Sequence, residues 1–185
     1  MPFIGALFYF SKAPRYIPVP YIKAKLFALA LFTIILPILL FYLLKIARKV
    51  RTIHLDTTRE RIIPLVLNTV IVLLITQRII LINELAELYF FFIGILLSTM
   101  ACLILAILKF KASIHMIAVS GVLMFFIALS IHFSINIIGE IALFFIIVGA
   151  TATSRLHMNA HTTIELIIGF FVGLIPQLIL LNYWL

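Results

Sequence analysis

Apolar residues occur along the chain in long, almost uninterrupted runs, and polar residues collect in the short stretches between them. Six runs can be distinguished, and most approach the ~20 residues that a helix needs to cross about 30 Å of hydrocarbon. We therefore predict membrane-spanning helices over residues 26–44, 62–82, 88–108, 116–133, 137–152 and 163–181. The fifth run is short and its boundary with the fourth is weakly marked, so five helices are the alternative.

The predicted fold class is all-α: a polytopic membrane helical bundle of about six transmembrane helices. The polar connections are brief, so residues 26–185 are expected to form a single bundle. Residues 1–25 are basic and aromatic and contain Pro14, Pro18 and Pro20, but they lack the cleavage pattern of a signal peptide. We expect this segment to lie at the membrane surface, with its aromatic side chains among the lipid headgroups.

Composition supports a membrane protein. Hydrophobic residues make up 65% of the chain, charged residues 11%, and the mean hydropathy is +1.32, which excludes an ordinary soluble domain. The net charge of +8 would suggest nucleic acid as the partner of a soluble protein. In a membrane chain it indicates lipid headgroups, topology and an anionic substrate instead, so no nucleic-acid partner is predicted. The single Cys102 rules out an internal disulfide.

Three polar stretches beside predicted helix starts carry residue types that bind and transfer phosphate. With six spans, the connections after the first, third and fifth helices emerge on one side of the membrane, so the three stretches share a face. Helix N-termini receive anions well because their first N–H groups lack intrahelical partners. The stretches are residues 54–64, with Arg59 and Arg61; residues 112–115, with Ser113 and His115; and residues 154–165, with Ser154, Arg155, His161 and Glu165.

The third stretch resembles the last motif of the type-2 phosphatidic acid phosphatase superfamily, in which Ser-Arg is followed after five residues by His and after three more by Asp. The second resembles the family's Pro-Ser-Gly-His, with Ser113 and His115 in place, and the first loosely resembles its Lys-(six residues)-Arg-Pro. The resemblance covers residues from about 51 to the C-terminus. It implies a short, bacterial-type member with the family's helical fold, in the inner membrane, with a periplasmic active face.

The resemblance also implies roles for individual residues, with no metal and no cofactor. His161 would be the nucleophile and His115 the general acid, while Arg155, Ser113, Ser154, Arg61 and Arg59 would bind the phosphate. The residue chemistry agrees with these roles. Glu165 lies four positions after His161, so its carboxylate can accept the proton of one imidazole nitrogen and leave the other as nucleophile. Arginine forks bind phosphate in a bidentate manner.

We therefore predict an integral membrane phosphatase that hydrolyses a lipid phosphate monoester or pyrophosphate through a phosphohistidine. Some residues depart from the family pattern: Glu165 stands for Asp, Ile114 for Gly, and His54 occupies the position of the Lys. These departures favour the alternative, an inactive phosphatase-like protein that binds a lipid phosphate or serves in a membrane complex. The four-residue spacing of His157, His161 and Glu165 would also suit a metal, although a site needs convergent ligands and second-shell support.

Overall fold

The computed structural model describes residues 1–48 and 57–185, and all the regular structure in these ranges is helical. Within these ranges, six helical segments are long and apolar enough to cross a membrane, which confirms the six-span prediction and makes this an integral membrane protein. The first span joins α2 (Val19–Ala30), the π-helix η1 (Leu31–Ile35) and α3 (Leu36–Ile46). The other spans are α4 (Thr58–Arg78), α5 (Ala86–Ile107), α6 (Ile114–Phe133), α7 (Ile138–His157) and α8 (Thr163–Leu180), which continues into the 3₁₀ turn η2 (Leu181–Tyr183).

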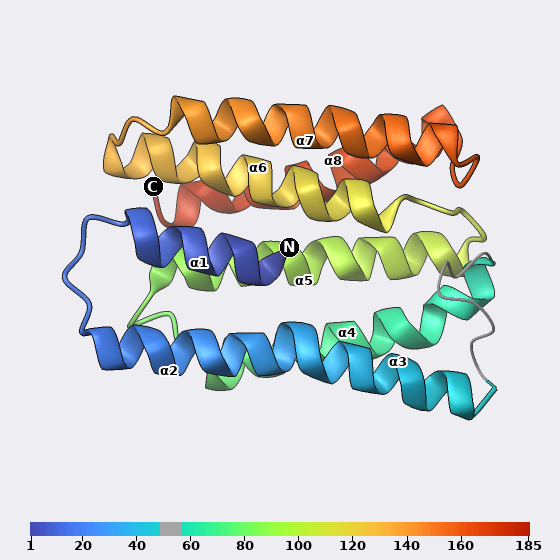
Figure 1. Ribbon diagram of the computed structural model, residues 1–185, viewed down its shortest axis with the longest axis horizontal. Helices are drawn as coiled ribbons and strands as arrows, with labels where there is room; N and C mark the ends of the chain where they lie inside the picture. Colours follow the sequence, from blue (N-terminus) through green and yellow to red (C-terminus); the bar gives the residue numbers. More distant parts are fainter. Residues whose placement is uncertain (49–56) are drawn as a thin grey trace.

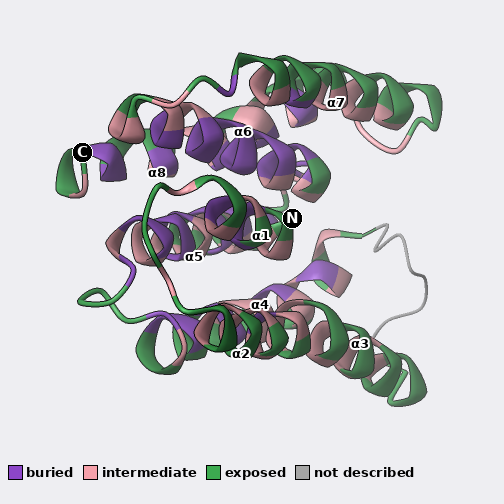
Figure 2. Cartoon of the chain, turned by 60° about the vertical axis from the view of Figure 1, so that its left-hand side comes forward, coloured by how far each residue is buried: buried purple, intermediate pink, exposed green. Residues whose placement is uncertain are grey.

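The long helices lie side by side along a common axis (Figure 1). Helix α6 packs against α1, α5, α7 and α8 and has more buried residues than any other described helix, whereas α7 and α2–α3 are largely exposed, as expected for helices that face lipid (Figure 2). Aromatic rings fill the centre: Phe91 of α5 stacks on Phe125 of α6 with ring centroids 4.1 Å apart. Such offset stacking adds to the area that the two rings bury.

Two glycines let α8 approach α6 closely. A Cβ at Gly169 would lie 2.9 Å from the carbonyl oxygen of Ser113, and a Cβ at Gly173 would collide with the Ile117 carbonyl and the Ser120 hydroxyl. Small residues at such interfaces allow the backbone contact that drives helix association in lipid. The register between α6 and α8 is therefore fixed by steric fit.

The three helices that start at the motif-bearing end all begin with a hydroxyl cap. The side-chain oxygens of Thr57, Ser113 and Thr162 accept hydrogen bonds from backbone N–H groups of α4, α6 and α8, at 3.4, 3.5 and 3.3 Å. Such caps contribute about 1 kcal/mol each. The helices that start at the opposite end, α5 and α7, have no side-chain cap hydrogen bond. The helix starts with side-chain caps therefore lie together at one end of the bundle.

The N-terminal segment differs from the sequence-based expectation. Residues 1–25 do not form one surface segment: α1 (Pro2–Lys12) packs lengthwise against α5 and α6, and the first span begins at Val19. Tyr9 has no exposed surface, and its hydroxyl donates to Glu87 at 3.0 Å. The partner is 78 residues away, so composition alone could not indicate the contact.

Glu87 is the centre of an ion-pair network at the end opposite the motifs. Its carboxylate is 1% exposed and lies 2.7 Å from an Arg15 guanidinium nitrogen and 3.2 Å from His132 Nε2. A buried carboxylate is tolerated only with such partners.

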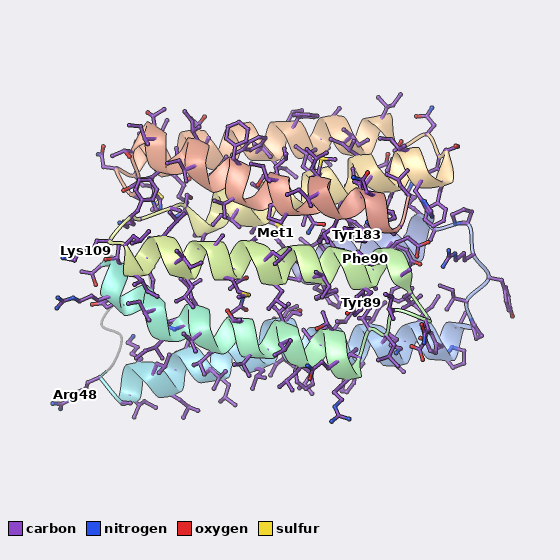
Figure 3. All side chains as sticks on the ribbon, turned by 180° about the vertical axis from the view of Figure 1, so that it is seen from behind. Met1, Arg48, Tyr89, Phe90, Lys109 and Tyr183 are labelled. Atoms are coloured by element: carbon purple, nitrogen blue, oxygen red, sulfur yellow. The ribbon has the colours of Figure 1, made fainter. Side chains whose placement is uncertain are left out.

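Figure 3 shows Lys109 and Arg48 at the motif-bearing end and the aromatic residues Tyr89, Phe90 and Tyr183 towards the other.

Helix α7 runs five residues beyond its predicted end at position 152, because it stops only at a Schellman turn. Asn159 has a φ of 50°, its N–H donates to the Leu156 carbonyl, and the N–H of Ala160 donates to the Arg155 carbonyl. Ser154 and Arg155 consequently lie in the last turn of α7, and not beside the start of the next helix as the apolar pattern predicted.

Candidate active site

The three stretches singled out in the sequence meet at one end of the bundle. The starts of α4, α6 and α8 lie together at the right of Figure 1, and those of α5 and α7 lie at the other end. A guanidinium nitrogen of Arg61 donates to the Ala112 carbonyl at 2.8 Å, and the N–H of Ser113 donates to the Glu165 carbonyl at 3.2 Å. The first stretch therefore contacts the second, and the second contacts the third.

His161 and Glu165 form a hydrogen-bonded pair. The Nδ1 atom of His161 lies 2.8 Å from Glu165 Oε2, and the His161 side chain is 4% exposed. A carboxylate oxygen accepts, so Nδ1 carries the proton and Nε2 keeps a lone pair. The four-residue spacing implied that His161 and Glu165 lie on one helix face, but α8 begins at Thr163, so His161 lies in the preceding turn.

Glu165 also caps the start of α8, a role that was not predicted from the sequence. Its Oε2 also accepts the N–H of Thr162 at 3.1 Å, while its own N–H donates to the Thr162 hydroxyl, which completes a capping box. The signal was present as a Thr followed three residues later by Glu. The box holds the carboxylate in a fixed rotamer, and the carboxylate in turn fixes the imidazole of His161.

Two positive charges act on His161. Burial lowers the pKa of His161, and the charges of Arg61 and Lys111 lower it further, against the opposing effect of Glu165. Arg61 is 5% exposed, and Lys111 donates to the Ala160 carbonyl at 3.1 Å. The neutral imidazole, which is the nucleophilic form, is thereby favoured. Lys111 was not predicted; a cation two positions before Ser113 was the available signal.

His115 and Arg155 complete the cluster. His115 lies exposed in the first turn of α6, and the charges of Arg155, His161 and Arg61 all act on its ring. Arg155 Nε is buried and has no hydrogen-bond partner within residues 1–48 and 57–185. A buried donor without a partner costs free energy, so an anion that accepted this hydrogen bond would be stabilised.

The remaining predicted phosphate ligands lie differently. Ser113 has no exposed surface and its hydroxyl caps α6, so the structure gives it a helix-capping contact where phosphate binding was predicted. Ser154 is exposed, with its hydroxyl 3.9 Å from the Met158 sulfur, and Arg59 is exposed in the first turn of α4. His54, at the position of the family's Lys, lies outside the described residues.

Comparisons with known proteins identify no relative: no protein family, no curated protein and no solved structure matches this chain. In the described part of the chain, no cluster of three or more His, Cys, Asp or Glu side chains is arranged to hold a metal ion. What the geometry provides is a tautomer-fixed imidazole, a second imidazole and three cationic side chains at one membrane face. This combination suits the binding of a phosphoryl group and attack on its phosphorus.

Proposed function

We propose that this protein is a membrane phosphatase that hydrolyses a lipid phosphate monoester or pyrophosphate through a phosphohistidine on His161. The observation that carries the proposal is the 2.8 Å pairing of His161 Nδ1 with Glu165, beside the charges of Arg61 and Lys111. The pairing directs the lone pair of Nε2 away from the carboxylate. The cations stabilise the negative charge of the phosphoryl oxygens.

The proposed reaction has two steps. His161 Nε2 attacks the phosphorus, the bond from phosphorus to the ester oxygen breaks, and His115 donates a proton to the departing oxygen. Water then attacks the phosphohistidine while His115 accepts a proton, and inorganic phosphate leaves with His161 restored. Arg61 and Arg155 would hold the phosphoryl oxygens during both steps.

A lipid is the proposed substrate because two of the connections at this face are short, so a large soluble molecule would have little protein surface to contact there. The turns before α6 and α8 comprise only residues 108–113 and 158–162. Location in a bacterial inner membrane with a periplasmic active face remains part of the proposal and rests on the family resemblance.

Release of inorganic phosphate in EDTA tests the proposal. The substrates are phosphatidic acid, phosphatidylglycerol phosphate, a polyprenyl pyrophosphate and a phosphorylated lipid A, presented to the purified, folded protein. His161→Ala is expected to abolish both turnover and the acid-labile phosphoenzyme, and His115→Ala to slow turnover by roughly 10²–10⁴-fold. Absence of turnover on every substrate, or full activity in His161→Ala, would refute the mechanism.

Arg155→Lys tests the role of the planar guanidinium. A lysine keeps the charge but removes the buried Nε donor, so turnover is expected to fall by roughly 10- to 150-fold, the effect of one hydrogen bond to a charged group. The variant is compared with wild type for phosphate release and thermal unfolding in the same detergent. Equal activity of the two proteins would show that Arg155 does not bind the phosphoryl group.

A second candidate function is binding of a lipid phosphate without turnover. It is favoured by the capping contacts of Ser113 and Glu165, and by Ile114, whose side chain lines the cavities beneath Arg61. This candidate expects a lipid phosphate to raise the unfolding temperature of the wild type while no inorganic phosphate is released. Appearance of a phosphoenzyme would exclude it.

A further inference from the structure

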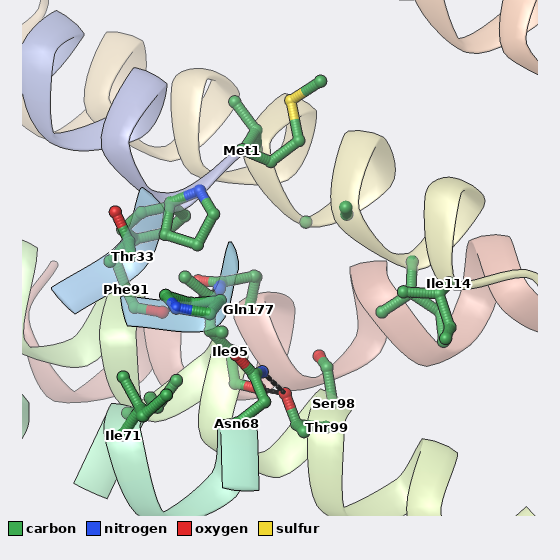
Figure 4. Close-up of a pocket in the computed structure, with 17 residues that line it drawn as sticks. Met1, Thr33, Asn68, Ile71, Phe91, Ile95, Ser98, Thr99, Ile114 and Gln177 are labelled. Atoms are coloured by element: carbon green, nitrogen blue, oxygen red, sulfur yellow. Dashed lines mark hydrogen bonds between the residues drawn. The ribbon is translucent and has the colours of Figure 1, made fainter. Parts of the chain in front are cut away.

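Two adjoining cavities lie inside the bundle below Arg61. The first, of about 300 Å³, lies between α3 and α4 and is lined by Arg61 and mainly apolar side chains that include Leu40, Phe41 and Leu44. The second, of about 220 Å³, lies farther from Arg61, among the start of α1, η1, α3, α4, α5 and α6, and reaches Gln177 of α8 (Figure 4). They share four lining residues: Pro37, Asn68, Ile71 and Ile114. The two cavities therefore adjoin, and Arg61 of the candidate active site lines the first of them.

The polar side chains of the second cavity already donate to the protein. The Ser98 and Thr99 hydroxyls donate to backbone carbonyls of their own helix, at 2.9 and 2.8 Å. Asn68 donates to the Thr99 hydroxyl at 3.4 Å, and Gln177 donates to the Phe91 carbonyl at 3.0 Å. These contacts occupy side-chain donors of the second cavity, and most of its other lining side chains are apolar, which suits hydrocarbon. A phosphate is therefore favoured at Arg61, and an apolar chain is favoured below it.

The wall formed by α3 faces the bilayer. None of the residues of α3 is buried, and the outward side chains of Ile38 and Leu39 are 52% and 54% exposed. The π-helix directly before α3, followed by Pro37, interrupts the regular α-helical hydrogen bonding of this span. Because α3 and α4 line the first cavity and α3 is exposed, a lipid chain can enter this cavity sideways, between the two helices.

We propose that one hydrocarbon chain of an anionic lipid enters between α3 and α4 and occupies the two cavities, with its phosphate at Arg61. The statement about the headgroup rests on the proposed function, whereas the position of the chain rests on the cavities. Their volumes are of the order of those of known small-molecule sites, roughly 300–1,000 Å³. The site would therefore select lipids by the length of this chain.

Photolabelling locates the chain directly. The full-length protein is incubated in detergent with hexadecyl phosphate that carries a diazirine on its last carbon, illuminated, and mapped by peptide mass spectrometry. The expected labels lie on residues of the second cavity such as Ile95 and Val122, and unlabelled hexadecyl phosphate should suppress them. Labelling confined to lipid-facing residues of α7, such as Phe145 and Ile146, would overturn the proposal.

A cavity-filling variant adds a kinetic test. Ile71 is 5% exposed and lines both cavities, so Ile71→Trp is expected to raise KM for hexadecyl phosphate at least roughly tenfold more than KM for butyl phosphate. The control is Val70→Trp, on the adjacent residue, which is 48% exposed. If Ile71→Trp does not fold, the wild-type label map decides.

The outcomes separate the two proposals. Cavity labelling without phosphate release from either ester would refute the phosphatase and support the chain site. If phosphate is released but Ile71→Trp changes KM equally for both esters, and the labels are spread over lipid-facing helices, the chain site is overturned and the phosphatase is kept.

Discussion

Glu165 combines a folding role with a proposed catalytic role, and two substitutions separate them. Its Oε2 accepts from both His161 Nδ1 and the Thr162 N–H, while its backbone N–H donates to the Thr162 hydroxyl. Glu165→Gln removes the charge but keeps an oxygen and nearly the same shape. Thr162→Ala removes the hydroxyl cap but leaves the carboxylate beside the imidazole.

The expected magnitudes differ for stability and turnover. A capping box accepts Gln as well as Glu, so Glu165→Gln should lower the free energy of unfolding by less than about 1 kcal/mol. Loss of a charge-assisted hydrogen bond to His161, about 1.5–3 kcal/mol, should slow turnover by roughly 10- to 150-fold. Thr162→Ala should lower the free energy of unfolding by about 1 kcal/mol and change turnover by less than about twofold.

The assay measures phosphate release and thermal unfolding on the same detergent preparations. If Glu165 has both roles, the two variants show opposite patterns: Glu165→Gln is stable but slow, and Thr162→Ala is less stable but active. If turnover and stability fall in parallel in both variants, or if Glu165→Gln is fully active, then the carboxylate only caps α8.

The pH dependence of turnover provides a further test. The pKa of His161 is lowered from its ordinary 6.5, so the neutral form of the proposed nucleophile and its contribution to stability should be complete above pH 6.5. Both should be lost as the pH falls towards the lower pKa that His161 has in the folded protein. Lys111→Met removes one of the charges that lower this pKa, so the acid limb of kcat/KM should move to higher pH, whereas Lys109→Met, at an exposed position two residues earlier, should not move it. Gly173→Ala should lower the free energy of unfolding by about 1–3 kcal/mol, and with it the unfolding temperature, because its Cβ would collide with α6. Gly149→Ala has open space around its Cβ and should be neutral or slightly stabilising. An unchanged acid limb in Lys111→Met, or equal stability of the two alanine variants, would contradict these assignments.

The six spans and the shared face of the motifs could be predicted because both follow from local properties. An apolar run long enough to cross a bilayer forms a helix whatever its neighbours, since its backbone groups must be satisfied internally. Once the spans are identified, successive connections must emerge on alternate sides of the membrane. The contacts of Arg61 with Ala112 and of Ser113 with Glu165 are consistent with this topology.

The features that could not be predicted depend on partners far away in the sequence. The aromatic and basic composition of the first residues suits a membrane surface, but Tyr9 and Arg15 instead meet Glu87, a buried carboxylate on α5. Likewise, Lys111 carried no motif, and its relation to His161 depends on the turn that brings Ala160 beside it. Pairings of this kind are decided by packing and not by periodicity.

The contact of α6 with α8 has a consequence for biosynthesis. The N–H of Ser113 donates to the Glu165 carbonyl, and Gly169 lies directly against Ser113, so the start of α6 is completed by α8, a helix that is translated after it. Most of α6 is buried in the complete bundle, so before α8 is inserted part of this surface must contact lipid. A nascent chain that ends before α8 therefore lacks the pairing of His161 with Glu165, and we expect the proposed phosphatase activity to be absent from such a chain.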